Sequence, residues 1–404
     1  FVMVVYYLLN IFKGQLGWEH NLYSFSSDPG ITYSAMNGYG HFVWPFTVYK
    51  IYWGAFALLL AVLANLLWSR GTENMLKWRF KLAALQLNKP TMAVTGAGMA
   101  IFLVTGGYIF YNTNILNTYR TSDEQEALQA IFEKTYKKYD GIPQPRITDV
   151  KLNVDIYPRE RAFAFEGHFW MKNKHQQPID SVHLMLSDEA NIRKMEFAKQ
   201  ATLVLDDKDN GYYIYRLAQP LQPGDSIQLN LDLFYETKGF RNSGSNTNIV
   251  YNGTFINSQY LPKVGYQSGF ELSNDDVRKE HGLAPKPRMA DVADSTARMN
   301  TYISNEADWV NFEATVSTVR NQIAIAPGYL QREWTEGDRR YFHYKMDAPI
   351  LNFYSFLSAD YQVKKDKWIG KDGKEVAIEI YYHKGHEYNL DRMIKGVKKS
   401  LDYF

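Results

Sequence analysis

The chain has 404 residues, a net charge of +2 and no cysteine. This is more sequence than one ordinary domain needs. The near balance of acids and bases argues against nucleic acid as a partner, and the lack of cysteine excludes disulfide scaffolds, thiolate zinc sites and cysteine nucleophiles.

Both ends of the chain show the patterns of interrupted elements. Phe1 to Phe12 is an apolar run without an initiator Met or the basic segment of a signal peptide, so it predicts the tail of a longer membrane span. Residues 389–404 have apolar side chains at helical spacing and end without a capping Gly or Pro. We therefore expect the chain to be a fragment of a larger polypeptide.

Two further apolar stretches complete a predicted membrane region over residues 1–111, with spans at about 42–68 and 91–111. The second has 21 residues without a charged side chain, and at ~1.5 Å of rise per residue it spans ~31 Å, close to the ~30 Å hydrocarbon core of a bilayer. Its small residues predict close packing against another helix, or are simply tolerated in a membrane. They are Gly96, Gly98, Ala100, Gly106 and Gly107.

The loop between these two spans is basic. The positive-inside rule places such a loop in the cytoplasm, and then everything after residue 111 is extracytoplasmic in a multi-pass cell-membrane protein. Alternatively, the basic residues form a solvated helix face without meaning for topology. The loop contains Arg70, Lys77, Arg79, Lys81 and Lys89 against one acid, Glu73.

Residues 112–146 are predicted to form a connecting helix and linker. Ser122 to Asp140 has an amphipathic pattern, in which Ser122 and Gln125 resemble a capping box and acidic residues lie near the N-terminal end. A glycine and two prolines then follow and end the helix. The hydrophobic period changes at about Ile147, which marks the start of the next domain.

From residue 147 to 388 the pattern is that of β-strands. Apolar and polar residues alternate in several runs, three of which are 150–156, 163–171 and 227–233. Short turn sequences between the runs favour antiparallel pairing, while Arg241 to Asn248 and Asn274 to Thr296 predict long loops with a little helix. The predicted fold class is therefore membrane α-helices followed by a mainly antiparallel β domain, a saddle-like β-sandwich, joined by an amphipathic helix.

No pattern in the sequence predicts a catalytic or metal-binding residue. His386 and the Glu after it begin an H-E-x-x-H motif, but Leu390 stands where the second His belongs. His383 and His386 could contact one ion but have no third ligand in view. Asp275 and Asp276 could be paired acids, although a solvated loop is the simpler interpretation.

Four stretches between Ile147 and Phe404 follow one another in an informative order. They are ITDVKLNVDIYPRERAFAFEGHFWMKNK, NSQYLPKVGY, WVNFEATVSTVRNQIAIAPGYL, and DAPILNFYSFLSADY with VAIEIYYHKGHEYNLDRMIKGVKKSLDYF. In this order they resemble parts of the N-terminal β domain of the zinc-dependent alanyl aminopeptidases, the gluzincin family that includes leukotriene hydrolase. The matching parts are its first hairpin, its substrate-facing loop, the strand before its Pro-Gly turn, and its last strands. Residues 389–404 would then begin the helix that enters a catalytic domain.

The resemblance implies a zinc site outside this chain. The family's Gly-x-Met-Glu-Asn strand and H-E-x-x-H helix are absent from the sequence, so the chain would hold no cofactor itself and the zinc would lie in a missing catalytic domain. The family commonly offers one Gln of this domain to the α-amine of the substrate, and Gln259 occupies the comparable loop, Asn257 to Tyr260. Leu261 and Pro262 follow where the family has a Glu, which leaves an ordinary loop amide as the alternative.

One version of this family looks fused behind the spans of a bacterial ABC-transporter-type permease. The resemblance therefore implies the membrane-anchored, substrate-facing part of a zinc metallo-aminopeptidase whose parent releases N-terminal amino acids from peptides. The expected partners are the lipid bilayer, a peptide substrate and an ABC ATPase subunit. The alternative is a non-catalytic extracytoplasmic binding or assembly module of a transporter permease.

Overall fold

The computed structural model describes residues 2–68, 76–295, 297–299 and 308–404. The chain divides into two compact units. The first holds Phe1–Leu128 with Thr237–Asn246, and the second holds Gln129–Glu236 with Thr247–Phe404. Arg70 and Glu73 of the predicted basic loop, and Thr296, lie outside the described residues.

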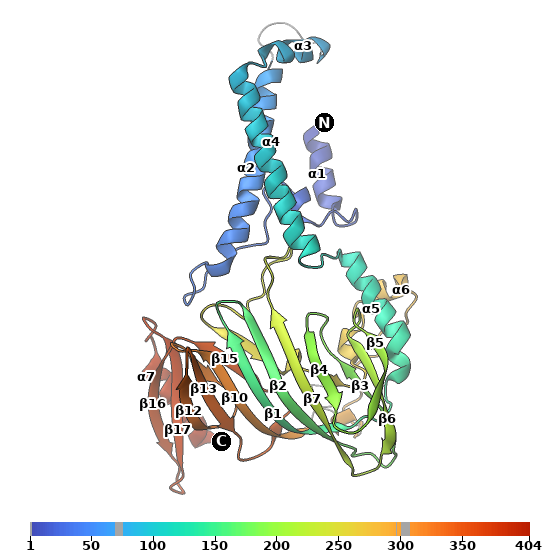
Figure 1. The fold of residues 1–404 in the computed structure, drawn as a ribbon, viewed down its shortest axis with the longest axis vertical. Helices are drawn as coiled ribbons and strands as arrows, with labels where there is room; N and C mark the ends of the chain where they lie inside the picture. Colours follow the sequence, from blue (N-terminus) through green and yellow to red (C-terminus); the bar gives the residue numbers. More distant parts are fainter. Residues whose placement is uncertain (1, 69–75, 296, 300–307) are drawn as a thin grey trace. The chain divides into compact units, whose positions relative to one another are not determined.

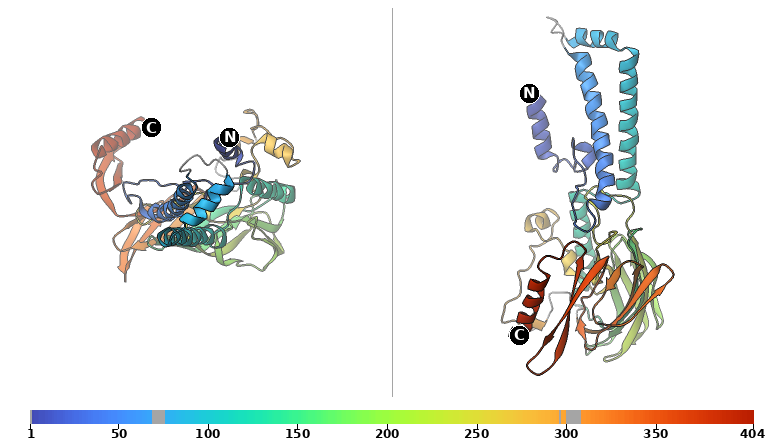
Figure 2. Two further views of the ribbon diagram at one scale, coloured as in Figure 1. Left: turned by 90° about the horizontal axis from the view of Figure 1, so that it is seen from above. Right: turned by 90° about the vertical axis from the view of Figure 1, so that its left-hand side faces the viewer.

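The first unit is built on two long apolar helices, α2 (Val43–Leu67) and α4 (Lys89–Phe110), which lie side by side (Figure 1, Figure 2). Together with adjoining turns, Gly40–Leu67 and Lys89–Ile115 are long and apolar enough to cross a membrane. Only 17% and 11% of their apolar windows are buried, unlike the core helices of a soluble protein. Both predicted spans are thus helices, with their ends shifted by a few residues. The shorter helices of this unit are α1 (Val2–Phe12) and α3 (Leu76–Gln86).

Two glycines of α4 lie against α2. A Cβ built on Gly98 would approach the Leu59 side chain to 3.3 Å, and one on Gly106 would approach the Tyr52 ring to 3.0 Å. The Tyr52 ring also stacks on that of Phe102, with centroids 4.6 Å apart. Gly96 and Gly107 have no such neighbour among the described residues. The predicted close packing is therefore confirmed for Gly98 and Gly106.

The segment Thr237–Asn246, which follows the β7 strand, packs among the helices of the first unit. The Phe240 ring is buried, with its centroid 6.1 Å from that of Tyr49 and 6.0 Å from that of Tyr108. Asn117 Nδ2 donates a hydrogen bond to the carbonyl oxygen of Lys238 at 2.8 Å. The segment Thr237–Asn246, although it follows a strand of the β domain, therefore packs as part of the helical unit.

The connecting helix α5 spans Ser122–Tyr136 and continues as a 3-10 turn over Lys137–Tyr139. Its capping box lies one residue earlier than predicted. The Thr121 hydroxyl accepts a hydrogen bond from the Glu124 N–H at 3.3 Å, and the Glu124 carboxylate accepts one from the Thr121 N–H at 2.8 Å. Ser122 does not form the box because it is already the first residue of the helix, and its N–H and hydroxyl both donate to the Glu19 carboxylate at 3.0 Å.

The second unit is the β domain, and its largest sheet has eight strands in the order β12-β13-β10-β1-β2-β7-β4, with β14 paired to β10. Pairing among the described strands is antiparallel except between β1 and β10, which run parallel with Leu152 beside Ala314. The strands of this sheet are β1 (Arg146–Tyr157), β2 (Ala162–Lys172), β4 (Asn191–Phe197), β7 (Ser226–Glu236), β10 (Trp309–Val319), β12 (Tyr329–Glu336), β13 (Arg339–Lys345) and β14 (Ile350–Leu351).

Three smaller sheets complete the domain. One is a four-stranded sheet of β5 (Ala201–Asp207), β6 (Tyr212–Leu221), β3 (Ile179–Met185) and β9 (Lys263–Val264). Another is a three-stranded sheet of β11 (Ile323–Ile325), β15 (Ser355–Ala359) and β8 (Thr254–Asn257). The last is the hairpin β16 (Tyr361–Ile369) and β17 (Glu375–His383). Short turns at Asp209-Asn210-Gly211 and Asp372-Gly373 connect β5 to β6 and β16 to β17.

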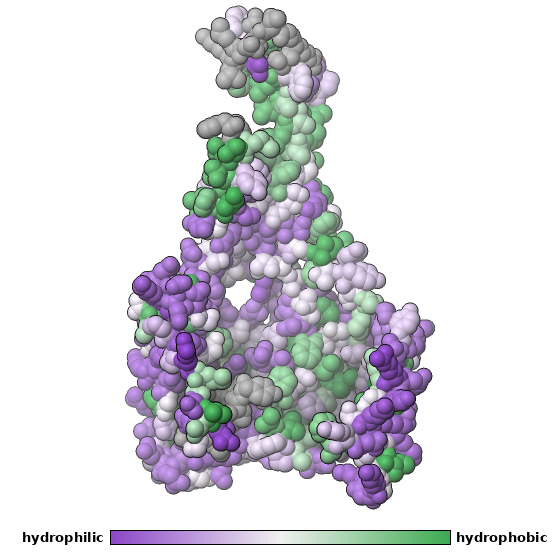
Figure 3. Space-filling view, turned by 180° about the vertical axis from the view of Figure 1, so that it is seen from behind, coloured by the Kyte–Doolittle hydropathy of each residue, from purple (hydrophilic) through white to green (hydrophobic). Residues whose placement is uncertain are grey.

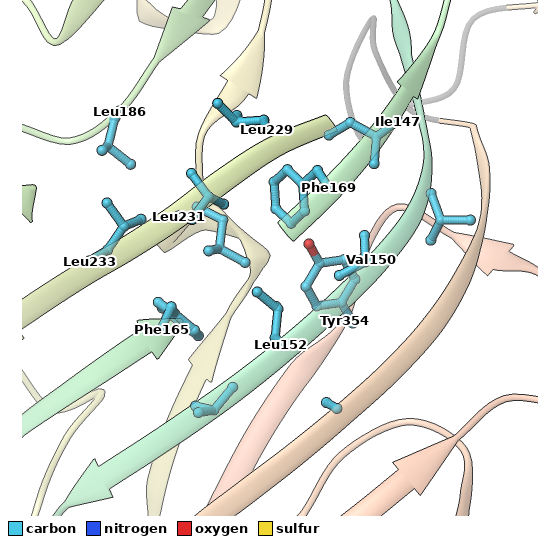
Figure 4. Close-up of a cluster of buried hydrophobic side chains, with 14 of the residues drawn as sticks. Ile147, Val150, Leu152, Phe165, Phe169, Leu186, Leu229, Leu231, Leu233 and Tyr354 are labelled. Carbon is cyan, nitrogen blue, oxygen red and sulfur yellow. The ribbon is translucent and has the colours of Figure 1, made fainter. Parts of the chain in front are cut away.

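The core lies on the inner face of the large sheet, as Figure 4 shows for 14 of its side chains. Successive side chains of a strand point to opposite faces, so Val150, Leu152 and Val154 of β1 are buried together. They share one cluster with Leu184 of the four-stranded sheet and Phe356 of the three-stranded sheet. The domain is therefore layered, as predicted.

Two helices lie in the second half of the β domain. α6 (Asp275–Glu280) is the small helix within the second predicted loop, and α7 (Leu390–Tyr403) is the predicted C-terminal helix. α7 packs on the last hairpin: Lys398 Nζ donates to the Asp366 carboxylate at 2.9 Å, and Trp368 Nε1 donates to that of Asp402 at 2.8 Å.

Candidate functional site

Gln259 lies in a single 3-10 turn, Ser258–Tyr260, directly after β8. Asn257 caps this turn, because its side-chain oxygen accepts a hydrogen bond from the Gln259 N–H at 2.9 Å. The N–H of Leu261 closes the turn on the Ser258 carbonyl at 3.1 Å. The backbone of Gln259 is therefore held in place while its side chain is exposed.

Tyr260 attaches this loop to the core. Its ring packs against that of Phe163 with centroids 4.9 Å apart, and its carbonyl accepts a hydrogen bond from the Tyr235 hydroxyl at 2.6 Å. Burial raises the pKa of Tyr235 far above its ordinary value, so that hydroxyl stays protonated and donates. Asn248 Nδ2 donates to the Tyr260 hydroxyl at 2.6 Å. Tyr260 therefore holds the loop on the core, while the side-chain amide of Gln259 in the same loop is exposed.

The three-stranded sheet beside this loop has an apolar row on the face that points away from the core. Phe255 of β8 pairs with Leu357 of β15, and Leu357 pairs with Ile325 of β11. Phe255 is 44% exposed, and the other two side chains are half-buried. One step along the strands Asn257 pairs with Ser355, so this face becomes polar toward Gln259. Such a face can bind an apolar partner surface and offer hydrogen bonds at one end.

A Pro-Gly turn fixes the outer strand of this sheet. Gly328, directly after Pro327, has a φ of +106°, and a Cβ there would lie 2.6 Å to 2.9 Å from backbone atoms of Lys345 and Met346. Glycine is required at this position because the conformation and the close approach both exclude a side chain. The turn passes the chain from β11 of the small sheet to β12 of the large one.

The resemblance implies a zinc site outside this chain, and the residues that the structure describes do not fit one. No group of three or more His, Asp or Glu side chains among them could hold a metal ion. His383 and His386 lie near one another, with ring centroids 5.6 Å apart, at the end of β17. Without a third ligand, this pair provides no zinc centre, and no chemical step follows from it.

Asp275 and Asp276 do not form an acid pair for catalysis. They lie in the first turn of α6, where Asn274 caps the helix and the Asp275 carboxylate accepts a hydrogen bond from the Lys286 N–H at 3.1 Å. Arg278 of the same helix forms a buried ion pair with Glu133 of α5 at 2.7 Å. This pair was not predicted, because the two residues are far apart in the sequence and neither has a local signature.

The apolar row was also not predicted. Alternation in a strand shows which residues share a face but not which strand lies beside it. The register that brings Phe255, Leu357 and Ile325 together comes from the pairing of three short strands.

No family model matches the sequence. No curated protein matches it either. Among solved structures, the chain is similar to an M1 zinc metallopeptidase from Deinococcus radiodurans, with 12% identity and a TM-score of 0.40 over 62% of this chain and 52% of that one. It is also similar to the Legionella pneumophila aminopeptidase A, with 9% identity and a TM-score of 0.42 over 65% of this chain and 27% of that one.

The chain thus spans about half the length of the Deinococcus enzyme. At this identity and TM-score, the likenesses assign neither a family nor a residue role to the chain.

Proposed function

We propose that this chain is the membrane-anchored, substrate-facing N-terminal portion of a bacterial zinc metallo-aminopeptidase fused to an ABC-transporter-type permease. The observation that carries the proposal is a single arrangement in the β domain. An exposed amide, Gln259, stands at the polar end of a partly exposed apolar sheet face, and this domain follows two candidate membrane helices.

The surface of α2 and α4 supports the anchoring role. Aliphatic side chains are exposed along the middle of both helices, and large aromatic side chains are exposed near their ends. Figure 3 shows hydrophobic residues on the surface of the helical part of the molecule. This is the pattern of a lipid-facing surface with aromatic belts. The exposed aromatics include Trp44, Trp68, Tyr108 and Tyr111. At ~1.5 Å per residue the 22-residue α4 is ~33 Å long, enough to cross the hydrocarbon core.

The order of elements supports an extracytoplasmic β domain. A chain that crosses the membrane with α2 and returns with α4 leaves α3 on one side and everything after residue 115 on the other. The basic residues around α3 favour the cytoplasm by the positive-inside rule. The β domain is then outside, where it meets peptides.

The β domain supplies one wall of a peptide cleft. The row of Phe255, Leu357 and Ile325 packs against a second apolar surface, and the Gln259 amide oxygen accepts a hydrogen bond from the free α-amine of a peptide. The zinc and the general base belong to another part of the parent polypeptide, and the permease part pairs with an ABC ATPase subunit. No catalytic step is assigned to the residues described here.

A second candidate function is a non-catalytic extracytoplasmic binding or assembly module of a transporter permease. The edge strand β12 favours it. Most of its side chains are exposed, and among the described strands it pairs with β13 alone, so its other edge can accept a strand from a partner.

Peptide binding to the intact chain in nanodiscs tests the proposed role of Gln259. Gln259→Ala should weaken binding of a peptide with a free N-terminus about tenfold, near 1.4 kcal/mol, and leave an N-acetylated peptide unaffected. Gln331→Ala, an exposed amide on β12, is the matched control. Equal affinities of wild type and Gln259→Ala for the free amine would refute the contact.

Two further measurements separate the candidate functions. The intact chain should release no amino acid from an aminoacyl reporter with added zinc, and turnover would show that its own residues are catalytic. The full-length gene should encode the Gly-x-Met-Glu-Asn and H-E-x-x-H motifs in the parent. A parent without them would leave the binding module as the better account.

A further inference from the structure

The short helix α3 lies crosswise at the end of the α2 and α4 pair (Figure 1, Figure 2). Trp78, Leu82 and Leu85 recur at the spacing of one helix face and are 47%, 45% and 76% exposed. Ala83 on another side of the helix is buried. Phe80, on the opposite side of the helix, is 60% exposed as well. A helix across the ends of two candidate membrane spans, with exposed indole, phenyl and leucine side chains, has the position of an interfacial helix.

Three of the basic residues on and beside this helix have no acidic partner among the described residues. Arg79, Lys81 and Lys89 form no ion pair there, and the buried Nε of Arg79 has no hydrogen-bond acceptor within the described ranges. The Lys81 ammonium lies 4.9 Å from the centre of the Trp78 ring, at the rim of the apolar face. The arrangement places cations beside side chains that enter the headgroup region, where phosphate oxygens are available.

We propose that α3 is an interfacial helix that selects anionic phospholipid headgroups in the leaflet on its side of the membrane. Trp78, Leu82 and Leu85 enter the boundary between headgroups and acyl chains, while Arg79 and Lys81 bind phosphate. A lipid is the occupant favoured by position, because a helix that lies in the chain between two membrane spans is already at headgroup depth. The inference rests on the anchoring part of the proposed function and adds a lipid class to it.

Lipid retention by the intact chain tests the proposal. The chain is purified in detergent and placed in nanodiscs of phosphatidylcholine with or without phosphatidylglycerol, and bound lipids are counted by native mass spectrometry. Wild type should retain phosphatidylglycerol in preference to phosphatidylcholine, and the double variant Arg79→Gln/Lys81→Gln should lose that preference about tenfold. Lys371→Gln/Lys374→Gln, with the same charge change in the β16–β17 turn, should keep it.

A second measurement places the helix at the interface. Brominated lipids should quench the fluorescence of wild type more than that of Trp78→Phe, since Trp78 would lie at the lipid boundary. Equal retention of phosphatidylglycerol by wild type and the Arg79/Lys81 variant would overturn lipid selection. Equal quenching would overturn the interfacial placement.

Alkaline carbonate extraction separates this inference from the proposed function. Extraction of the chain from membranes would overturn the membrane anchor and the inference together. A chain that stays in the membrane without preferring anionic lipid would overturn the inference alone. Loss of binding to an acidic peptide in the Arg79/Lys81 variant, with lipid retention unchanged, would assign the surface to a protein instead.

Discussion

Arg278 donates two hydrogen bonds to the Glu133 carboxylate, from Nη1 to Oε2 at 2.7 Å and from Nη2 to Oε1 at 2.8 Å, and both side chains are buried. Lys137 donates a third bond to the same carboxylate at 2.9 Å. Burial opposes ionisation of Glu133, but the bonds from Arg278 and Lys137 outweigh it and lower the pKa. The pair joins α5 to α6 across 145 positions of sequence.

Removing one partner of this pair should be strongly destabilising. Arg278→Met leaves Glu133 buried with only the half-exposed Lys137 as a partner, so the unfolding free energy should fall by about 3–5 kcal/mol. Urea unfolding of the intact chain in micelles, followed by tryptophan fluorescence, measures this change. Lys365→Met breaks the exposed pair with Glu379 and should cost less than about 1 kcal/mol. Similar losses in both variants would contradict the buried role of Arg278.

The Pro-Gly turn should not accept a side chain. Gly328→Ala puts a Cβ against the backbone of Lys345 at a φ of +106°, which should cost about 2–4 kcal/mol. Gly337→Ala is the control, because its φ is +57° and no described atom lies within 4 Å of the added Cβ, so only about 1 kcal/mol is expected. Urea midpoints of the two variants give the comparison, and equal midpoints would exclude the close approach at Gly328.

The α2 and α4 packing can be tested with two neighbouring glycines. Gly106→Leu should force Tyr52 away and destabilise the helix pair by about 1–3 kcal/mol, because a Cβ already reaches the ring at 3.0 Å. Gly107→Leu adds the same volume where no described atom is near, so it should have little effect. Thermal melting in micelles, with a disulfide cross-link engineered between the helices as a second readout, measures the difference. Equal melting of the two variants would contradict the contact.

Acid should destabilise the β domain through His183. Its side chain is buried, with Nδ1 2.9 Å from the Tyr212 hydroxyl and Nε2 3.2 Å from the Ser181 hydroxyl. Burial lowers the pKa of His183 to about 4. Above pH ~6.5 the His183 imidazole is neutral in both the folded and the unfolded chain, so it does not lower the stability of the domain there. As the pH falls from 6.5 toward 4, the unfolded chain takes up a proton that the folded chain refuses, so stability declines by up to about 3 kcal/mol and then levels off.

His183→Asn tests this pH dependence. The amide keeps a polar group near Tyr212 but does not titrate, so the melting temperature of the variant should fall less between pH 6.5 and 4 than that of wild type. The carboxylates of the domain titrate in both proteins and cancel in the difference. Parallel curves would show that His183 is not the group responsible.

The sequence predicted the helices and strands well in segments where the hydrophobic residues repeat with a single helical or strand period. Val150, Leu152 and Val154 alternate with polar residues and are buried in β1, and all but the last residue of the uncharged run at 91–111 lies within α4. The α5 cap was predicted one residue too late. Both positions carry Ser or Thr, and only the reciprocal bonds between Thr121 and Glu124 distinguish them.

The candidate site could be predicted in part. The loop of Gln259 was identified by resemblance, and its role as an amine contact stays a prediction. The apolar row beside it depends on pairing between β8, β15 and β11, whose residues are about 30 to 100 positions apart. Local periodicity contains no information on such pairing, because register is decided by the partner strand.

By itself, the sequence determined the apolar length of the two spans, the period of the strands and the turns between them. These are local properties, set by hydrophobicity and backbone conformation over a few residues. The tertiary structure alone decided the Arg278–Glu133 pair, the parallel contact of β1 with β10, and the packing of Thr237–Asn246 among the helices. Each joins residues far apart in the chain, and the free energy of such a contact depends on burial and geometry that exist only once the chain has folded.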